Sequence, residues 1–375
     1  MPQGLFNPFF QNGASWYGSG GGEAPIVPID FTGINRVIEM GDSIMVSNNA
    51  SPASNSYRAR LASTYTWTEV NLSLGGSGTW NEISSFHQAT VAPRATTVII
   101  ESAGLNDIRN SHDQKTFNKI ESCLHSILKR CFQKSGVAAG SGSVTRSGSF
   151  TVFDAAVHGG KYDSAGGIGG NSACFNTTAN ATWTYAFTGV AISVTFSASD
   201  PTINRGVAEI RIDGVLVDTV DDLMQRFDGV SDGVNDNKRG PHTVTYFGLT
   251  NAAHSIEVKA LTGSPSVVVD EFSVLDENIA NLGVVFVLEV PKITDYAIAG
   301  RDQASDAYID QVNALRESVV DLYAAAGYPV YFIPIMLGNQ GFYDVTTGID
   351  SDGVHPTNTG HDQIFDSIVQ WISYP

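Results

Sequence analysis

A serine, an aspartate and a histidine in this chain have the residue types and the local context of a hydrolytic site. Ser43 follows Gly41-Asp42 at the end of the apolar run Val37–Met40, and we expect Gly41 to let the backbone bend sharply there. A serine at the carboxyl end of a buried strand lies where α/β sheets bind ligands, so it is a candidate nucleophile. The alternative is a serine or aspartate that only caps a helix.

Asp352 and His355 stand three residues apart near the end of the chain, just before Pro356. On a helical turn or a tight loop this spacing lets the carboxylate bond one imidazole nitrogen while the other nitrogen faces a nucleophile. The aspartate then fixes the tautomer and stabilises the imidazolium that forms when the histidine takes a proton. The alternative is a helix that begins at the proline, with both residues on the surface.

Two further polar turns follow apolar strands. One is the segment from Asn71 to Gly76 (Asn-Leu-Ser-Leu-Gly-Gly), and the other is Gly104-Leu105-Asn106-Asp107. Glycine N–H groups and a neutral amide can hold a negatively charged oxygen. Because carboxyl ends of parallel strands gather at one sheet edge, we expect these turns to lie near Ser43.

The four blocks, in this order, resemble those of the SGNH (GDSL-type) hydrolase family, over roughly residues 33–134 and 280–373. The resemblance implies that Ser43 is the nucleophile, that His355 is the base and that Asp352 orients it. It also implies an oxyanion hole made by the backbone N–H of Ser43, the backbone N–H of Gly76 and the side chain of Asn106. The spacing from Asn71 favours Gly76 over Gly75.

The resemblance further implies a three-layer α/β/α, flavodoxin-like domain with a parallel sheet. The hydrophobic pattern agrees, with buried strands that alternate with amphipathic helices. The predicted strands are Asn35–Gly41, Trp67–Leu74, Thr96–Ser102, Gly283–Val290 and Pro329–Ile335, and the predicted helices are Phe117–Cys131, Ala304–Ala326 and Thr359–Ile372.

Between these halves, residues 136–278 lose the helical pattern and show short alternating runs typical of an antiparallel β-sandwich. These runs are Ser149–Phe153, Ala181–Phe187, Ala191–Ser197, Val207–Val215, His242–Phe247, Ser255–Leu261 and Ser266–Leu275. We therefore expect an N-terminal arm at 1–24, a hydrolase domain made of 25–135 and 279–375, and an inserted sandwich at 136–278. Three consecutive domains are the alternative.

The composition excludes several classes. The 375 residues carry a net charge of -17, which repels nucleic acid phosphates and anionic membranes. No apolar run approaches the roughly 20 residues needed to span a bilayer, and residues 1–24 lack the pattern of a signal peptide. The three cysteines are expected to be buried free thiols. No metal or cofactor is predicted, because the acidic segment 228–236 lacks the spacing of a calcium loop.

Together these features predict a serine esterase. The inserted segment resembles the jelly-roll-like, carbohydrate-binding sandwiches often attached to carbohydrate-active enzymes, through the runs Ile210–Val215 and His254–Val258. This resemblance implies a carbohydrate esterase that removes O-acetyl groups from a polysaccharide. The aromatic arm at 1–24 is expected either to lie on its own domain or to dock to a subunit or particle. With the missing signal peptide it favours an extracellular or phage tail-associated protein. One alternative is an esterase or lipase for small or acyl-chain esters. An alternative of another class is a non-catalytic glycan-binding adhesin. For an esterase, the expected partner is its substrate, an acylated carbohydrate or a small ester.

Overall fold

The structure is a computed structural model that describes most of the chain. The described residues are 28–46, 50–75, 79, 95–102, 104–108, 114–152, 173–199, 206–221, 239–294, 305–338 and 340–373. The arm predicted at 1–24 lies outside them, so its docking role stays a prediction.

Strands from two distant parts of the chain form one parallel sheet, four of them largely apolar and the fifth, at its edge, polar and largely exposed. Its five strands lie in the order β17-β16-β4-β2-β3, and every neighbouring pair is parallel. The strands are β2 (Arg36–Met40), β3 (Thr68–Asn71), β4 (Thr97–Glu101), β16 (Val284–Leu288) and β17 (Val330–Ile333). All of β4 is buried, as expected of a strand covered on both faces. The predicted parallel pairing between the two halves of the chain is confirmed.

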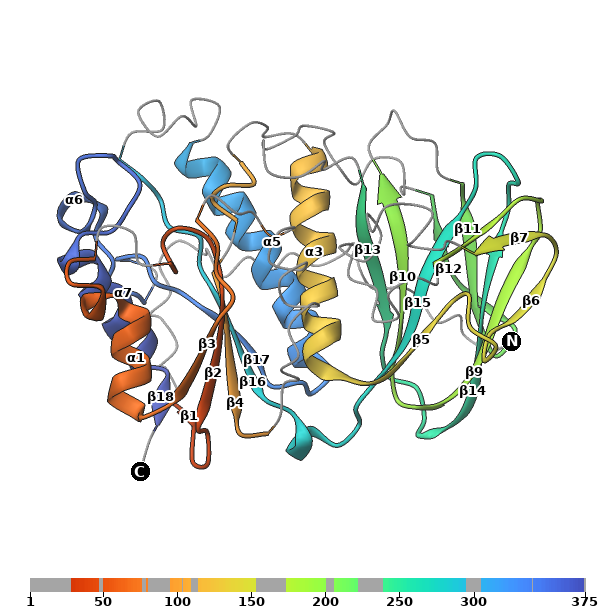
Figure 1. Ribbon diagram of the computed structural model, residues 1–375, viewed down its shortest axis with the longest axis horizontal. Coiled ribbons are helices and arrows are strands. Elements are labelled where there is room, and N and C mark those ends of the chain that lie inside the picture. Colours follow the sequence, from red (N-terminus) through yellow and green to blue (C-terminus); the bar gives the residue numbers. More distant parts are fainter. Residues whose placement is uncertain are drawn as a thin grey trace.

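Helices cover both faces of this sheet (Figure 1). Successive strand residues point to opposite faces, so Val37 and Val98 pack in a cluster with residues of α1 and α7, whereas Ile38 and Ile99 join residues of α3 and α5. The helices are α1 (Tyr57–Tyr65), α3 (Gln114–Phe132), α5 (Asp306–Ala325), α6 (Val345–Gly348) and α7 (Asn358–Val369), with single 3₁₀ turns at η1 (Ala53–Asn55) and η3 (Ile279–Asn281). Hydroxyl side chains cap the starts of α1, α5 and α7.

The middle of the chain forms two antiparallel sheets packed face to face. One has the order β13-β10-β15-β8-β7, with β5 also paired to β15, and the other has the order β12-β11-β14-β9-β6. Rings cross the space between the sheets, as in the contact of Phe150 with Trp183 and that of Tyr185 with Phe272. The β-sandwich predicted for this part of the chain is confirmed. Its described residues form more strands than the alternating sequence pattern indicated.

The strands of the first sheet are β5 (Gln133–Ala138), β7 (Phe150–Val152), β8 (Cys174–Asn176), β10 (Ile192–Ser199), β13 (Arg239–Tyr246) and β15 (Val268–Leu275). Those of the second are β6 (Thr145–Ser147), β9 (Thr182–Gly189), β11 (Ala208–Ile212), β12 (Val215–Val220) and β14 (Ala252–Ala260). β5 follows α3 directly and spans the boundary predicted after residue 135.

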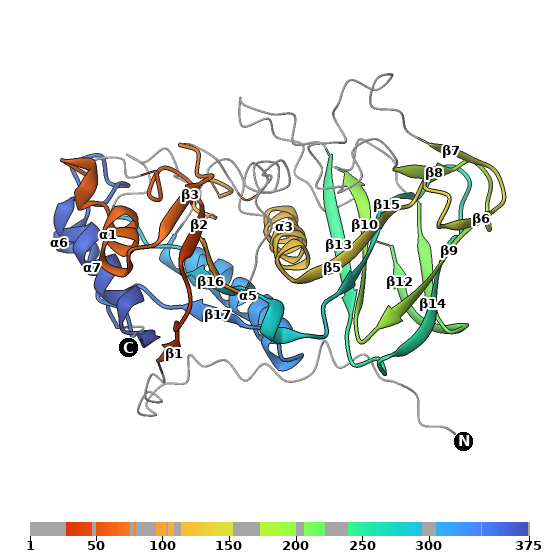
Figure 2. The ribbon, with the colours of Figure 1, turned by 60° about the horizontal axis from the view of Figure 1, so that its bottom comes forward.

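Helix α3 lies between the parallel sheet and the β13-β10-β15 face of the sandwich (Figures 1 and 2). The contact is polar although it is buried. Lys129 of α3 forms an ion pair with Glu271 of β15 at 2.9 Å, and both side chains are almost fully excluded from solvent. Ser126 bonds Thr243 at 2.8 Å. The sandwich is therefore joined to α3 through paired polar groups as well as through apolar packing.

Two smaller features complete the fold. Strand β1 (Ile29–Asp30) pairs in parallel with β18 (Ile372–Ser373), a contact between the chain's ends that the sequence did not predict. Cys123, Cys131 and Cys174 are free and buried, which confirms the expected thiols. No helix in the described part of the chain is long and apolar enough to cross a membrane.

Candidate active site

The turn after β2 presents Ser43 at the carboxyl edge of the parallel sheet. Asp42 holds this turn, since its Oδ1 accepts from the backbone N–H of Ile44 at 2.9 Å and its carbonyl accepts from Val46 at 3.0 Å. The φ of Gly41 is not positive, so this turn does not depend on a backbone conformation that only glycine adopts readily. A Cβ there would instead lie 2.3 Å from Ser102 Oγ and 2.7 Å from Met45 Cβ. Glycine is required at this position by close packing, which corrects the conformational explanation.

The structure brings Ser43, His355 and Asp352 into one hydrogen-bonded chain. The Oγ of Ser43 lies 2.7 Å from Nε2 of His355, across a separation of 312 residues. The Nδ1 of the same imidazole lies 2.6 Å from Oδ2 of Asp352. Ser43 is buried, while the side chains of His355 and Asp352 are 21% and 42% exposed. Solvent therefore reaches the site from the histidine side.

A tight turn, and not a helical one, sets the geometry of the Asp–His pair. Asp352 Oδ1 accepts from the backbone N–H groups of Val354 and His355, both at 2.9 Å. Gly353 adopts a φ of 72° within the turn, and helix α7 begins only after it, at Asn358. Burial alone would raise the pKa of Asp352, but the hydrogen bonds from His355 and Val354 outweigh it and lower that pKa to about 2. The carboxylate is thus charged and oriented near neutral pH.

Asn106 lies on the turn that follows β4. Its Nδ2 points to Oδ2 of Asp42 at 3.5 Å, which joins this turn to the nucleophile turn. Asp107 anchors the same segment: it accepts from the backbone N–H of Thr79 at 2.8 Å and lies 3.3 Å from Lys119 Nζ. Asp107 therefore braces the turn that carries Asn106.

Gly76 lies outside the described residues, so its predicted oxyanion role stays a prediction. The segment that leads to it does start beside the nucleophile turn, because the N–H of Leu74 donates to the carbonyl of Gly41 at 3.0 Å. Asn71 shapes this segment by accepting from the N–H of Ser73 at 2.9 Å.

A buried ion pair that the sequence analysis did not identify braces the same edge of the sheet. Arg316 of α5 and Glu101 of β4 are both fully excluded from solvent and form a two-pronged pair. Arg316 also donates to the carbonyl of Leu288 at the end of β16, at 3.0 Å. The signal was present in the sequence, because Arg316 lies on the apolar face of its predicted helix and Glu101 lies inside an apolar strand.

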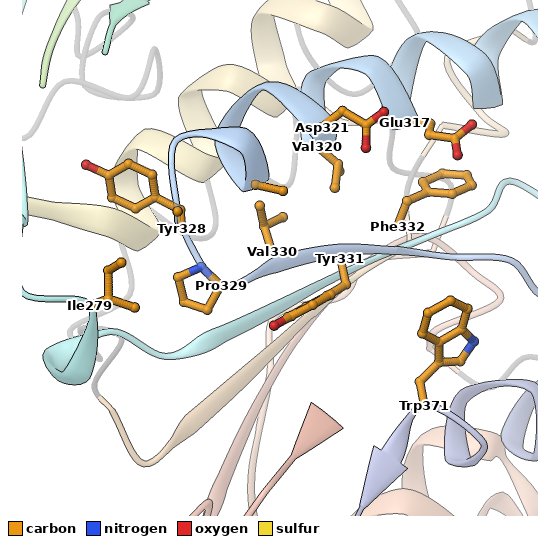
Figure 3. A pocket seen from close by; sticks show the side chains of 12 residues that line it. Ile279, Glu317, Val320, Asp321, Tyr328, Pro329, Val330, Tyr331, Phe332 and Trp371 are labelled. Carbon is orange, nitrogen blue, oxygen red and sulfur yellow. The ribbon is translucent and has the colours of Figure 1, made fainter. Parts of the chain in front are cut away.

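A cavity of about 440 Å³ opens at the other end of the sheet, between α5, β17 and the turn that carries Trp371. Figure 3 shows Tyr331 and Trp371 lining it below α5. Its wall includes the C-terminal part of α5 and Gly327–Val330, which lead into the amino end of β17. Ser43 stands at the carboxyl ends of the strands, so this cavity is no part of the candidate site. Among the described residues no group of three or more His, Cys, Asp or Glu is arranged to hold a metal ion.

No family model matches the chain, and no curated protein matches it. A two-domain esterase active on acetylated mannans, co-crystallized with mannopentaose, is 11% identical with a TM-score of 0.34, over 66% of this chain and 93% of that one.

Two carbohydrate-binding modules are also similar. A family 35 module from an environmental isolate is 14% identical with a TM-score of 0.25, over 39% of this chain and 92% of its own. A CBM36 module in complex with calcium and xylotriose is 18% identical with a TM-score of 0.23, over 37% and 97%. At these identities and TM-scores, the likeness does not show what activity this chain has.

Proposed function

We propose that this chain is a serine esterase of the SGNH (GDSL-type) kind. The observation that carries the proposal is the hydrogen-bonded chain from Ser43 Oγ through the imidazole of His355 to the carboxylate of Asp352. His355 Nε2 accepts the proton of Ser43 as Oγ attacks the ester carbonyl, and it later donates that proton to the leaving alcohol. Asp352 keeps Nδ1 protonated and stabilises the imidazolium.

The tetrahedral intermediate carries a negative oxygen that needs donors. The backbone N–H of Ser43, the backbone N–H of Gly76 and the Nδ2 of Asn106 are the proposed oxyanion hole. One such donor is typically worth about 2.7–4 kcal/mol of transition-state stabilisation. The 3.5 Å bond between Asn106 and Asp42 supports this role, because it ties the amide to the turn that carries the nucleophile.

For the domain organisation, we propose a three-layer, flavodoxin-like hydrolase domain made of 25–135 and 279–375, with the sandwich at 136–278 inserted into it. For the substrate, we propose an O-acetyl group on a polysaccharide. The exposure of His355 and Asp352 supports this choice, since an ester carried on a polymer can approach the site from the surface. The phage tail association stays a prediction that depends on the arm at 1–24.

The test compares Ser43→Ala with the unchanged protein on p-nitrophenyl acetate, p-nitrophenyl octanoate and a panel of acetylated polysaccharides. Acetate release should require Ser43 and should favour acetyl over octanoyl esters. Ser73→Ala is the matched control, because Ser73 is another buried serine at this edge, with its Oγ 3.4 Å from the carbonyl of Glu39.

The outcomes distinguish the candidate functions. Unchanged hydrolysis by Ser43→Ala would refute the serine mechanism. A strong preference for octanoate would favour the acyl-chain esterase or lipase. Glycan binding without any ester hydrolysis by the unchanged protein would favour the adhesin.

A further inference from the structure

The carboxylate of Asp42 connects two turns that come from different strands. Its Oδ1 accepts from the N–H of Ile44 at 2.9 Å within the nucleophile turn. Its Oδ2 accepts from Nδ2 of Asn106 at 3.5 Å on the turn after β4. Asp42 is only 1% exposed, so water does not compete for these contacts. A residue that served only to shape its own turn would need only the first of them.

The chemistry of the two groups makes the second contact directional. A side-chain amide presents a donor end and an acceptor end of nearly equal size, and only its surroundings decide which end points where. An ionised carboxylate can only accept, so it repels the amide oxygen and attracts the NH₂ group. The carboxylate therefore selects one of the two amide orientations, with Nδ2 on the side of the nucleophile turn.

We propose that Asp42 is a positioning residue that orients the amide of Asn106 for oxyanion binding. The inference rests on the proposed esterase function. One N–H of Nδ2 is held by Asp42, and the other N–H of the same nitrogen donates to the oxyanion. The nucleophile turn and the oxyanion donor are then held in register by one buried carboxylate.

The test is a double-mutant cycle with Asp42→Asn, Asn106→Ala and the combination. Asp42→Asn keeps the size and the acceptor for Ile44 N–H, but it can place an NH₂ group against the NH₂ of Asn106. We expect kcat for p-nitrophenyl acetate to fall about tenfold to a hundredfold with KM changed by less than about twofold, below the roughly 10²–10³-fold loss from removing an oxyanion donor. In the Asn106→Ala background, Asp42→Asn should cost less than about threefold more.

Losses that multiply in the combination would overturn the inference, as would an unchanged kcat in Asp42→Asn. If Asp42→Asn does not fold, Asp42→Ser replaces it, because a serine hydroxyl can still accept from Ile44 N–H but cannot reach Asn106. All rates are divided by the fraction of sites that a phosphonate titrant labels, so a loss of folded protein is not counted as a loss of kcat.

Glu289→Gln is the matched control. Glu289 is another buried carboxylate near this edge of the sheet, and its Oε2 accepts from the N–H groups of Ile335 and Met336 at 2.9 Å. These bonds hold the turn after β17 and not the turn that carries Asn106, so kcat per folded molecule should be unchanged in Glu289→Gln. Full activity in Ser43→Ala would refute the serine mechanism on which the inference rests, whereas an inactive Ser43→Ala with multiplying losses in the cycle would refute only the role of Asp42.

Discussion

The chain of Ser43, His355 and Asp352 differs in its access to water from the network beneath α3. That network joins Ser126 and Lys129 of the helix to Thr195, Thr243 and Glu271 of the sandwich. His355 and Asp352 are 21% and 42% exposed, and turns carry all three members of the Ser43 chain. Lys129 and Glu271 beneath α3 are 0% and 1% exposed, and regular elements carry them. Losing a partner in water costs little stability, whereas losing one in the interior leaves an unpaired buried group.

The comparison separates chemistry from folding. Substitutions in the chain of Ser43, His355 and Asp352 should lower the catalytic rate with little effect on the free energy of unfolding. The network beneath α3 should control stability, with activity following the folded fraction.

The largest effect is expected for Asp352→Asn at the Ser43 edge. The amide can hold His355 in the wrong tautomer, so kcat should fall about 10⁴-fold. Because Asp352 is partly exposed, the melting temperature should change little. Steady-state kinetics and thermal unfolding of the same sample check both statements. A large loss of stability with a modest loss of rate would break the division.

The second effect is expected for Lys129→Met beneath α3. It leaves the carboxylate of Glu271 buried without its ion-pair partner, which typically costs about 3–5 kcal/mol of unfolding free energy. Lys129→Met combined with Glu271→Leu should recover much of the loss, because no buried charge then remains from this pair. Denaturant unfolding measures all variants, and activity per folded molecule should stay constant.

Lys134→Met is the control for that prediction. Lys134 pairs with Glu277 at 2.6 Å, but its side chain is 47% exposed, so this variant should show no measurable change. Equal losses in Lys129→Met and Lys134→Met would show that burial does not distinguish the two pairs.

The third effect concerns pH. Burial raises the pKa of Glu39 from its ordinary 4.5 to about 8, against the opposing effect of Arg58. The folded protein therefore holds a proton that the unfolded chain releases, and this contribution to stability falls as pH rises from 4.5 to 8. Between pH 5 and 7.5 the loss should be about 3 kcal/mol, and Glu39→Gln should remove it. Urea unfolding across this range measures how the free energy of unfolding changes with pH. The same pH dependence in both proteins would contradict the raised pKa of Glu39.

The smallest effect is expected for Thr243→Val in the network beneath α3. Its Oγ1 lies 2.8 Å from Ser126 Oγ and 3.0 Å from Thr195 Oγ1, so the change leaves two buried hydroxyls with one partner fewer. We expect a loss of about 1–2 kcal/mol in unfolding free energy. Thr346→Val, at an exposed bond of 2.8 Å to Asp344, should lose less. A larger loss at the exposed position would contradict the comparison.

The two regions also differ in what the sequence reveals. Strands β2, β4, β16 and β17 are predictable because each is a largely apolar run that ends in a turn, and Ser43 and Asn106 follow two of these runs. Strand β3 (Thr68–Asn71) is polar and largely exposed, so its pattern is weaker. The two-residue strands β1 and β18 are too short to leave a pattern. The bond from Asp42 to Asn106 is invisible in the sequence because it depends on how two turns face each other.

The network beneath α3 is hidden for another reason. In β10, Ile192, Val194 and Phe196 alternate with three polar residues, a pattern typical of a strand with one face in water. Yet Ser193, Thr195 and Ser197 are at most 2% exposed. Helix α3 packs on this face of the sheet. The alternation of apolar and polar residues along β10 does not reveal that a helix covers the polar side.

The proposal that Ser43 is the nucleophile is tested most directly by finding which residue an organophosphate labels. The protein is treated with diethyl p-nitrophenyl phosphate, digested and mapped by mass spectrometry, next to His355→Ala. We predict one phosphoryl adduct, on Ser43, that forms far more slowly in His355→Ala because the base is missing. An adduct on another residue, or equal labelling rates in the two proteins, would contradict it.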